Sequence, residues 1–295
     1  MDCGARLNRE VNQLCIVGTG LLGASLGLGL RAAGFSGTIV GVGRRQSTVD
    51  RAKQLGCIDH ATTDLAGAAS KSQLAVLATP LGTFRTLFQR LAECDHQSLI
   101  ITDVGSTKQL VCGLAHTTLP DPSRFVGSHP MAGSEQQGPE SARTDLFVSN
   151  KCIVTPEPQT GPEALSLVRT FWTTLGMKLV EMSPAEHDRK AACISHMPHA
   201  AAVMLVSLAA REQALDVAAS GFRDTTRVAS GDPTVWTDIF MSNRQDLITA
   251  IDAFAVAMQR LRAMLACDDT PGLREELRCG KALRDEWEHK REANR

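Results

Sequence analysis

His129 is the side chain of this sequence best suited to acid–base chemistry. It lies in a run of mostly small residues, Gly127-Ser128-His129-Pro130-Met131-Ala132-Gly133. Small residues let a ligand approach the backbone, and the proline favours extended geometry at the histidine. A neutral imidazole can accept a proton near pH 7. We predict a loop at the junction of two domains in which this histidine does chemistry; a histidine that only caps a turn is the alternative.

The strands before His129 are expected to bring other loops to the same place. Three apolar runs have the character of buried strands: residues 73–80, 99–102 and 125–126. Thr79 and Pro80 end the first run, and Ser106 and His129 follow the other two. Ligands of open α/β sheets bind beyond the carboxyl ends of the strands. We expect these loops to meet at a cofactor, where Ser106 hydrogen-bonds a substrate hydroxyl or the nicotinamide amide, caps the following helix, or does both.

A glycine-rich turn near the N-terminus has the form of a dinucleotide-binding motif. The segment Gly18-Thr19-Gly20-Leu21-Leu22-Gly23 lies within a predicted strand–helix–strand unit, whose elements are at residues 14–17, 24–33 and 38–42. The G-x-G-x-x-G pattern is informative only in this context. The unit therefore predicts dinucleotide binding, with a glycine-rich turn that binds nothing as the alternative.

Each residue of this motif has an expected task. Gly18 permits the tight turn, Gly20 lets the backbone approach a pyrophosphate, and Gly23 allows close packing of helix and strand. Leu21 and Leu22 lie between them, where unpaired helix N-terminal amides can bind phosphate.

The end of the second predicted strand favours NADP over NAD. An NAD site usually has an acidic residue there, which holds the ribose 2′-hydroxyl. This sequence has Gly43-Arg44-Arg45-Gln46-Ser47-Thr48, without a carboxylate. Guanidinium groups suit a phosphate dianion. Arg44, Arg45 and Ser47 are therefore predicted to bind the 2′-phosphate, with NAD as the second cofactor and a solvated basic turn as the alternative.

Composition and charge exclude several classes of partner. The 31 basic and 32 acidic residues nearly balance, which gives no electrostatic case for nucleic acid or an anionic membrane. The nine cysteines are scattered singly, which argues against a metal site and favours reduced thiols. The first ten residues are polar and lack the apolar region of a signal peptide. We expect a cytoplasmic protein.

The chain is predicted to form two domains. Residues 1–160 read as a Rossmann-type α/β dinucleotide-binding domain, and residues 161–295 as an all-α domain that binds substrate and dimerises. The apolar run 191–210 is about long enough to span a bilayer, but its histidines and proline would be costly in lipid. We expect no membrane partner, and instead a helix buried inside the domain or a dimer.

Two groups of polar residues in the helical half are candidates for substrate binding. His196 and His199 are three residues apart and share a face of a helix, which favours a ligand-facing patch over two structural histidines. Arg227 has a planar fork that matches a carboxylate. The alternative for this arginine is an intrahelical pair with Asp224.

Together these segments resemble the prephenate/arogenate dehydrogenase family of tyrosine biosynthesis. The matching segments occur in the family's order between about residues 12 and 265: Gly18-x-Gly20-x-x-Gly23, Asp103-Val104-Gly105-Ser106-Thr107-Lys108, Gly127-Ser128-His129-Pro130-Met131-Ala132-Gly133, Glu186-His187-Asp188, Ser195-His196-Met197-Pro198-His199 and Gly221-Phe222-Arg223-Asp224-Thr225-Thr226-Arg227. The first is common to many families. The His-Pro-Met-Ala-Gly segment combined with Phe-x-Asp-x-Thr-Arg is specific.

The resemblance implies oxidative decarboxylation of prephenate to 4-hydroxyphenylpyruvate, or of arogenate to tyrosine, with hydride transfer to NAD(P)+. His129 matches the catalytic histidine that takes the proton of the ring hydroxyl, and Ser106 matches the residue that assists it. Arg227 matches the arginine that binds a substrate carboxylate. Three further residues match positions at the pocket entrance: His199, Glu135 and Asp224. A homodimer formed through the helical domain is expected.

The sequence also departs from parts of the family pattern. We expect no fused chorismate mutase domain and no regulatory domain, although competition by tyrosine at the active site stays open. His199 favours prephenate slightly, because some arogenate-specific members lack this histidine. Two other readings are kept. A β-hydroxyacid dehydrogenase would need a lysine near the pocket, for which Lys190 is the candidate, and a non-catalytic NADP sensor would need no base.

Overall fold

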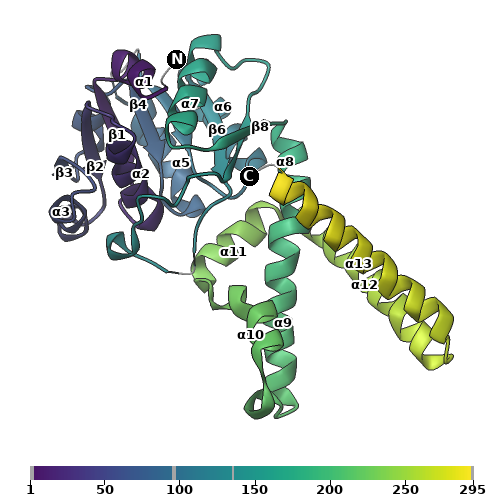
Figure 1. Cartoon of the computed structure of the whole chain (residues 1–295). Coiled ribbons are helices and arrows are strands. Elements are labelled where there is room, and N and C mark those ends of the chain that lie inside the picture. Colours follow the sequence, from purple (N-terminus) through teal and green to yellow (C-terminus); the bar gives the residue numbers. More distant parts are fainter. Residues whose placement is uncertain (1–2, 95–97, 135, 294–295) are drawn as a thin grey trace. The chain divides into compact units, whose positions relative to one another are not determined.

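The structure is a computed structural model that describes residues 3–94, 98–134 and 136–293 (Figure 1). Its internal contacts divide the chain into two units, Met1–Arg244 and Gln245–Arg295. The second unit holds nearly all of α12 (Arg244–Ala266) and the whole of α13 (Thr270–Ala293). The first unit holds the other described elements and every residue of the candidate site below.

An eight-stranded sheet in the order β3-β2-β1-β4-β5-β6-β7-β8 organises the first unit. Its strands are β1 (Gln13–Val17), β2 (Thr38–Val42), β3 (His60–Thr62), β4 (Leu74–Leu77), β5 (Ile100–Asp103), β6 (Phe125–Pro130), β7 (Lys151–Thr155) and β8 (Lys178–Glu181). Neighbouring strands are parallel, except that β6 and β7 are antiparallel. The strand order reverses between β1 and β4, which is where α/β sheets bind ligands. The predicted Rossmann-type domain is confirmed.

Both faces of this sheet are buried. In β1, Leu14 and Ile16 belong to one apolar core, whereas Cys15 and Val17 belong to the other. This alternation follows from the two-residue period of a strand, and burial of both faces is typical of a parallel sheet. Helices supply the other side of each core: α1 (Cys3–Glu10), α2 (Leu21–Ala32) and α7 (Pro162–Thr174) on one face, and α4 (Leu65–Ala69), α5 (Phe84–Ala92) and α6 (Gln109–Thr118) on the other.

The described chain after β8 is helical, as predicted. Its helices in the first unit are α8 (Pro184–Ala191), a π turn η4 (Ala192–His196), α9 (Met197–Arg211), α10 (Ser220–Thr226) and α11 (Pro233–Ser242). Ser183 caps α8 by accepting a hydrogen bond from the Glu186 amide at 3.2 Å, and Pro184 opens the helix, as the sequence predicts. The domain boundary after residue 160 stays a prediction; the sheet continues through β8.

Strand β6 is longer than predicted, and it contains His129. The residues Gly127–Pro130 pair with Thr155 to Cys152 of β7 in antiparallel register. Pro130 fits because it is the last residue of the strand. The prediction of a loop at this histidine is therefore wrong, since pairing with β7 extends the strand. His129 sits on a hydrogen-bonded ladder, which fixes its backbone more firmly than a loop would.

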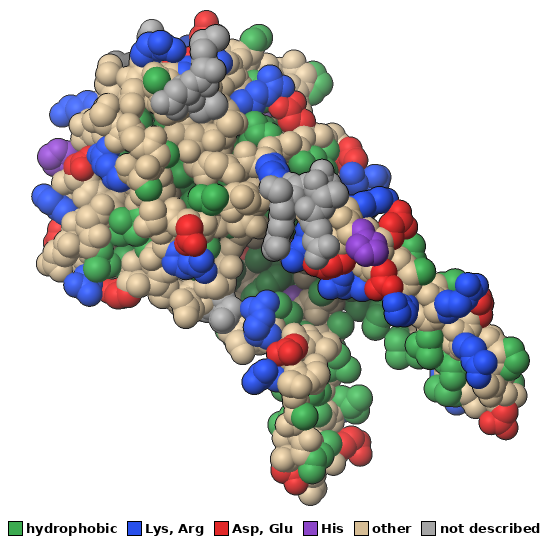
Figure 2. Space-filling model, in the orientation of Figure 1, with side chains coloured by type: hydrophobic (Ala, Val, Ile, Leu, Met, Phe, Trp, Pro, Cys, Tyr) green, Lys and Arg blue, Asp and Glu red, His purple; other side chains and the backbone are tan. Residues whose placement is uncertain are grey.

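Much of the apolar surface of α9 is exposed. Among the described residues, Pro184–Arg211 is long and apolar enough to cross a membrane by length and composition alone, with 28% of the apolar stretch buried. The exposed large side chains of α9 are Met204, Leu205 and Leu208. Figure 2 shows hydrophobic side chains along the part of the surface formed by α9 and α10. Burial inside its own domain accounts for only part of this apolar surface, and burial of the helix in a dimer stays a prediction.

Candidate active site

The glycine-rich turn after β1 has the geometry that a pyrophosphate requires. Gly18 has a φ of +97°, and a Cβ there would lie 2.5 Å from the Ala78 carbonyl oxygen. A Cβ on Gly23 would lie 1.8 Å from the Gly18 carbonyl oxygen, whereas one on Gly20 would meet nothing within 4 Å. The first and third glycines are thus required by packing, and the second leaves open space for a ligand. The tight turn expected at Gly18 and the close packing expected at Gly23 are thus present, whereas the approach of a pyrophosphate to Gly20 stays a prediction.

Helix α2 begins at this turn, three residues earlier than predicted. Its first residues are Leu21 and Leu22, and its N-cap residue Gly20 supplies no side-chain cap. The amides of the first turn therefore remain available to an anion. The Thr19 hydroxyl oxygen is buried and has no hydrogen-bond partner among the described residues. An unsatisfied buried hydroxyl beside free helix amides fits the diphosphate of a dinucleotide.

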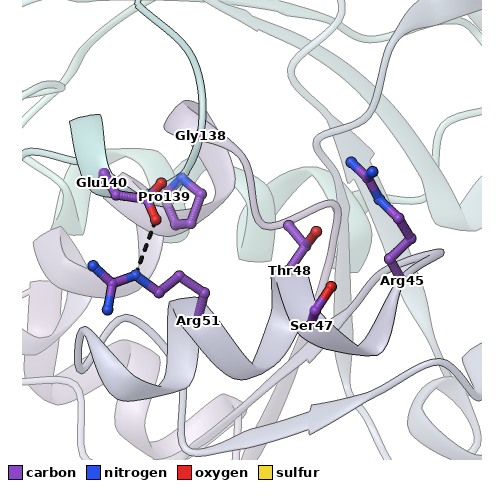
Figure 3. Close-up of a pocket in the computed structure, with 7 residues that line it drawn as sticks. All are labelled: Arg45, Ser47, Thr48, Arg51, Gly138, Pro139 and Glu140. Carbon is purple, nitrogen blue, oxygen red and sulfur yellow. Dashed lines mark hydrogen bonds and ion pairs between the residues drawn. The ribbon is translucent and has the colours of Figure 1, made fainter.

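A pocket of about 330 Å³ lies beside the end of β2 (Figure 3). It is lined by Arg45, Ser47, Thr48, Arg51, Gly138, Pro139 and Glu140. The first four come from the start of α3 (Gln46–Gln54), and the last three from the segment that follows β6. Arg51 and Glu140 form an ion pair at 2.9 Å across it. Two of the three residues predicted to bind a 2′-phosphate line this pocket, whereas the third, Arg44, is exposed and does not.

The loop after β4 is tied both to itself and to the helical region. The Thr79 and Thr83 hydroxyls are 2.7 Å apart, and Thr83 also donates to the Pro80 carbonyl. The Gly82 amide donates to Asp238 of α11 at 3.1 Å. Because β4 lies next to β1 in the sheet, Thr79 and Pro80 lie at the same edge as the glycine-rich turn, as expected from the sequence.

His129 makes a hydrogen bond to a second histidine. Its Nδ1 lies 2.8 Å from Nε2 of His187, which is in α8. The Nδ1 of His187 lies 2.7 Å from Oδ1 of Asp188. His187 and Asp188 are fully buried, and His129 is nearly so. The imidazole of the candidate base is thus held at one nitrogen by a buried partner.

Asp188 connects this line of side chains to two other elements. Its carboxylate accepts hydrogen bonds from the Lys108 amide at 2.7 Å and the Gln109 amide at 2.9 Å, at the start of α6. Its carbonyl oxygen accepts from the Asn243 side chain at 2.7 Å. The Asn243 side chain also lies 3.2 Å from Nδ1 of His196. The loop after β5 and helices α8 and α11 are therefore joined beneath His129.

A buried ion pair fixes the strand that carries His129. The Lys108 ammonium contacts Asp103 and donates to the Ser128 carbonyl at 2.8 Å. Asp103 in turn accepts from the Ser128 amide at 2.9 Å and the Gly105 amide at 2.7 Å. Burial raises the pKa of Asp103, while Lys108 and the two amides lower it. The residue next to His129 is thus bound at both backbone polar groups.

Ser106 lies in the loop that this ion pair encloses. The residue is partly buried, and the N-cap of α6 is Lys108, so the prediction that Ser106 caps this helix is wrong. Its backbone contacts His196, whose ring also influences the pKa of His129. Ser106 and His129 are therefore both neighbours of the His196 ring.

Burial sets the protonation state of His129. It lowers the pKa of this histidine well below 6.5, and the nearby His187, Lys108 and His196 act in the same direction. His129 is consequently neutral near pH 7. A neutral imidazole is the form that can accept a proton.

The two histidines predicted to face a ligand, His196 in η4 and His199 in α9, are both buried. Burial lowers the pKa of His196 to about 4, while the Asp188 carboxylate and, more weakly, a backbone contact with Ser106 act in the opposite direction. His199 stacks on Trp236 with ring centroids 3.5 Å apart. Nε2 of His196 and Nδ1 of His199 lack a hydrogen bond of good geometry within the described part of the chain. Weaker backbone contacts reach both rings, from Ser106 to His196 and from Val228 to His199, and binding of a ligand by these histidines stays a prediction.

The remaining predicted residues lie outside this buried cluster. Arg227 opens a short turn that packs beside α9, and its side chain is exposed, as is that of Asp224. Asp224 accepts from Arg223 at 3.3 Å. Glu135 lies outside the described residues. Lys190, the lysine that a β-hydroxyacid dehydrogenase would need, is exposed and pairs with Glu186 one helical turn away.

Sequence reasoning missed the residues that support His129. His187 and Asp188 occur in a segment quoted for its resemblance, but no role was assigned to them there. Asp103 and Lys108 likewise lie in a segment that matches the family but indicates no role for them, and Asn243 lies in none. The sequence does offer one indication of their role. His187 and Asp188 place an imidazole beside a carboxylate, shortly before His196 and His199.

Comparisons with known proteins agree with this geometry. Residues 26–181 match the family described as "Prephenate dehydrogenase, nucleotide-binding domain", and residues 183–279 match "Prephenate dehydrogenase, dimerization domain". Prephenate dehydrogenase of Bacillus subtilis is 32% identical over 286 residues, which are 95% of this chain and 77% of that protein.

Two solved structures are similar over nearly their whole length. Prephenate dehydrogenase from A. aeolicus, in complex with hydroxyphenyl propionate and NAD+, has a TM-score of 0.88 and 33% identity and covers 93% of this chain and 98% of its own. Synechocystis arogenate dehydrogenase has a TM-score of 0.80 and 31% identity, with coverages of 93% and 99%. A dinucleotide-binding sheet joined to a matching helical region makes this protein an oxidoreductase that uses a nicotinamide dinucleotide, and the chain belongs to the prephenate dehydrogenase family.

Proposed function

We propose that this enzyme oxidatively decarboxylates prephenate to 4-hydroxyphenylpyruvate in tyrosine biosynthesis. The observation that carries the proposal is the buried neutral imidazole of His129, at the end of β6 and within a hydrogen-bonded cluster beside the cofactor edge of the sheet. Arogenate is the second candidate substrate, because an arogenate dehydrogenase is among the similar structures. The presence of His199 favours prephenate.

His129 acts as the base in this proposal. Because Nδ1 faces His187, Nε2 is the nitrogen that can meet the ring hydroxyl of the substrate. It takes the hydroxyl proton as hydride leaves the carbon that bears this hydroxyl. The ring carboxylate then departs as carbon dioxide, and its electrons make the ring aromatic and leave a phenolate oxygen. The proton returns from His129 to that oxygen and gives the phenol of the product. The nicotinamide ring, when bound, supplies the hydride acceptor. The protein provides position and a dry environment for the proton transfer.

Other residues orient the substrate. Ser106 is proposed to assist the ring hydroxyl, and Arg227 to bind a carboxylate through its planar guanidinium. His196 and His199 are proposed to contact a polar group of the substrate; both rings are buried, and each also has a backbone contact, with Ser106 and Val228 respectively. Asp224 and Glu135 are proposed at the pocket entrance, on the family resemblance alone.

We further propose that NADP is the preferred cofactor and NAD the second. The pocket at α3 supports this preference, because two arginines and two hydroxyls line it against a single carboxylate. That carboxylate, Glu140, is engaged by Arg51 and does not repel a phosphate as a free charge would. Gly18, Gly20, Gly23, Leu21 and Leu22 are proposed to hold the diphosphate, and Thr79, Pro80 and Ser106 the nicotinamide end.

We propose a homodimer in the cytoplasm. The match of residues 183–279 to a dimerization domain and the exposed apolar side chains of α9 support the dimer. Sedimentation equilibrium of the full chain tests it. The cytoplasmic location rests on the singly scattered cysteines of the sequence, which favour reduced thiols.

The test is the initial rate of nicotinamide reduction by the purified chain in four reactions, which cross prephenate or arogenate with NADP+ or NAD+. We expect the highest kcat/KM with prephenate and NADP+. Faster turnover of arogenate would replace the proposed substrate, and faster turnover with NAD+ would overturn the proposed role of the α3 pocket. Absence of turnover in all four reactions, with NADP still bound, would refute the proposed activity.

A further inference from the structure

Three buried side chains form a hydrogen-bonded line that ends at His129. His129 Nδ1 lies 2.8 Å from His187 Nε2, and His187 Nδ1 lies 2.7 Å from Asp188 Oδ1. We call these three residues the histidine relay. Because His187 and Asp188 are fully buried, water does not compete for these bonds.

The far end of the relay determines where its protons lie. Asp188 accepts from the amides of Lys108 and Gln109, and a backbone N–H can only donate. Both amides belong to the start of α6, which favours a negative charge. The carboxylate is therefore an acceptor, and His187 must carry its proton on Nδ1. His187 Nε2 is then an acceptor too, so that His129 carries its proton on Nδ1 and leaves Nε2 bare.

We propose that Asp188 is a positioning residue that acts through His187 to hold His129 as its Nδ1–H tautomer and to stabilise the imidazolium formed when Nε2 accepts a proton. The inference rests on the proposed function of His129 as the base. In this step one N–H bond forms at Nε2 and the O–H bond of the substrate breaks. The line of three side chains changes its total charge from −1 to 0. A carboxylate orients a catalytic imidazole in the same way in serine proteases.

The other charged and titratable groups around His129 oppose this effect. Burial lowers the pKa of His129 most, and His187 within the relay, Lys108 before α6 and His196 in η4 lower it further. Asp103 is a further carboxylate nearby, but Lys108 and two backbone amides engage it. Asp188 is therefore the carboxylate that is linked to the His129 ring by hydrogen bonds, through His187.

The first test is the kinetics of Asp188→Asn and His187→Phe. We expect kcat to fall by about 100- to 10,000-fold in both, with the KM of each substrate changed by less than about threefold. The acid limb of the kcat/KM profile should move to lower pH in Asp188→Asn, because loss of the carboxylate disfavours the imidazolium. A kcat within about threefold of the parent, with an unmoved acid limb, would overturn the proposal.

The conservative variant His187→Gln separates positioning from packing. The side-chain oxygen of glutamine can accept from His129 Nδ1 in place of the imidazole nitrogen, but it cannot pass charge to Asp188. We expect its kcat to exceed that of His187→Phe by about tenfold. Equal rates for the two variants would contradict control of the tautomer. The matched control is His60→Asn, an exposed histidine on β3, which should keep the parent rate.

A second test does not depend on turnover. In the full chain labelled with 15N-histidine, the ring resonances of His129 are identified by their loss in His129→Asn. We expect neutral His129 to show a protonated Nδ1 and an unprotonated Nε2. The opposite tautomer would overturn the proposal even if the enzyme oxidises prephenate. The expected tautomer in a protein without that activity would preserve the relay and refute only the proposed reaction.

Discussion

The α3 pocket and the histidine relay belong to the same proposed site, but they are built in opposite ways. Arg45 and Ser47 are exposed at the pocket, and its one ion pair, Arg51–Glu140, joins two surface side chains. In the relay, His187 and Asp188 have no exposure, and each hydrogen bond is 2.7 or 2.8 Å long.

This difference separates recognition from chemistry. Exposed charges are screened by salt and water, so each contributes a modest share of binding and can be exchanged for another. A buried polar group has no such substitute, because loss of one partner leaves the other unsatisfied. We therefore expect changes at the relay to abolish kcat and changes at the pocket to shift KM for one cofactor.

The largest effect is expected from His129→Asn. Asparagine keeps a polar side chain but removes the proton acceptor, so kcat should fall by at least about 10,000-fold. NADP should bind with nearly unchanged affinity, because the residues proposed to hold it lie on other elements. Initial-rate assays measure kcat, and a fluorescence titration with NADPH measures the affinity for the cofactor. Residual activity within about tenfold of the parent would show that another group is the base.

Breaking the ion pair beneath the strand should cost stability. Lys108→Met leaves Asp103 buried without its cation, and the free energy of unfolding should fall by about 3–5 kcal/mol. Urea unfolding measures this loss. The control is Lys190→Met, which breaks an exposed pair and should change little. The double variant Asp103→Asn/Lys108→Met should lose less than the sum of its single changes, because they share one interaction. Equal losses for Lys108→Met and the control would contradict the buried pair's importance.

The sequence predicted one side of this comparison better than the other. The glycine-rich turn and the arginines after β2 are local patterns, and their strand–helix–strand context follows from apolar periodicity. The relay joins residues 58 positions apart, and no period links His129 to His187. The Gly and Pro residues around His129 predict a loop, whereas pairing with β7 draws these residues into a strand. Tertiary pairing thus overrode local propensity at the catalytic position.

The pH dependence of kcat/KM tests the lowered pKa of buried His129 without any substitution. His129 must be neutral to act, and burial lowers its pKa well below 6.5. As pH falls, kcat/KM should therefore stay level through 6.5 and decline about tenfold per unit only below the lowered pKa. Initial rates with freshly added substrate between pH 4.5 and 8 cover roughly this range. An acid limb at or above pH 6.5 would mean that the working base is more exposed than His129.

At the exposed side, Arg45→Ala should raise KM for NADP+ by about tenfold and leave that for NAD+ within about twofold. Added salt should reduce the difference in KM for NADP+ between the parent and Arg45→Ala, because salt screens the charge of Arg45. Arg44→Ala is the matched control, because Arg44 is exposed but does not line the pocket. A larger loss for Arg44→Ala than for Arg45→Ala would place the 2′-phosphate outside the α3 pocket.

The smallest effect is expected at the carboxylate of this pocket. Glu140→Gln removes the negative charge and releases Arg51 from the 2.9 Å pair. Because the pair is exposed and screened, the gain should be limited to a decrease of about two- to fivefold in KM for NADP+, with no change for NAD+. Thermal unfolding should be unchanged, since both side chains are at the surface. A rise in KM for NADP+ would reverse the interpretation. It would mean that the Arg51–Glu140 pair helps to hold the bound cofactor. The α3 pocket would then depend on an ion pair, as the relay depends on its hydrogen bonds.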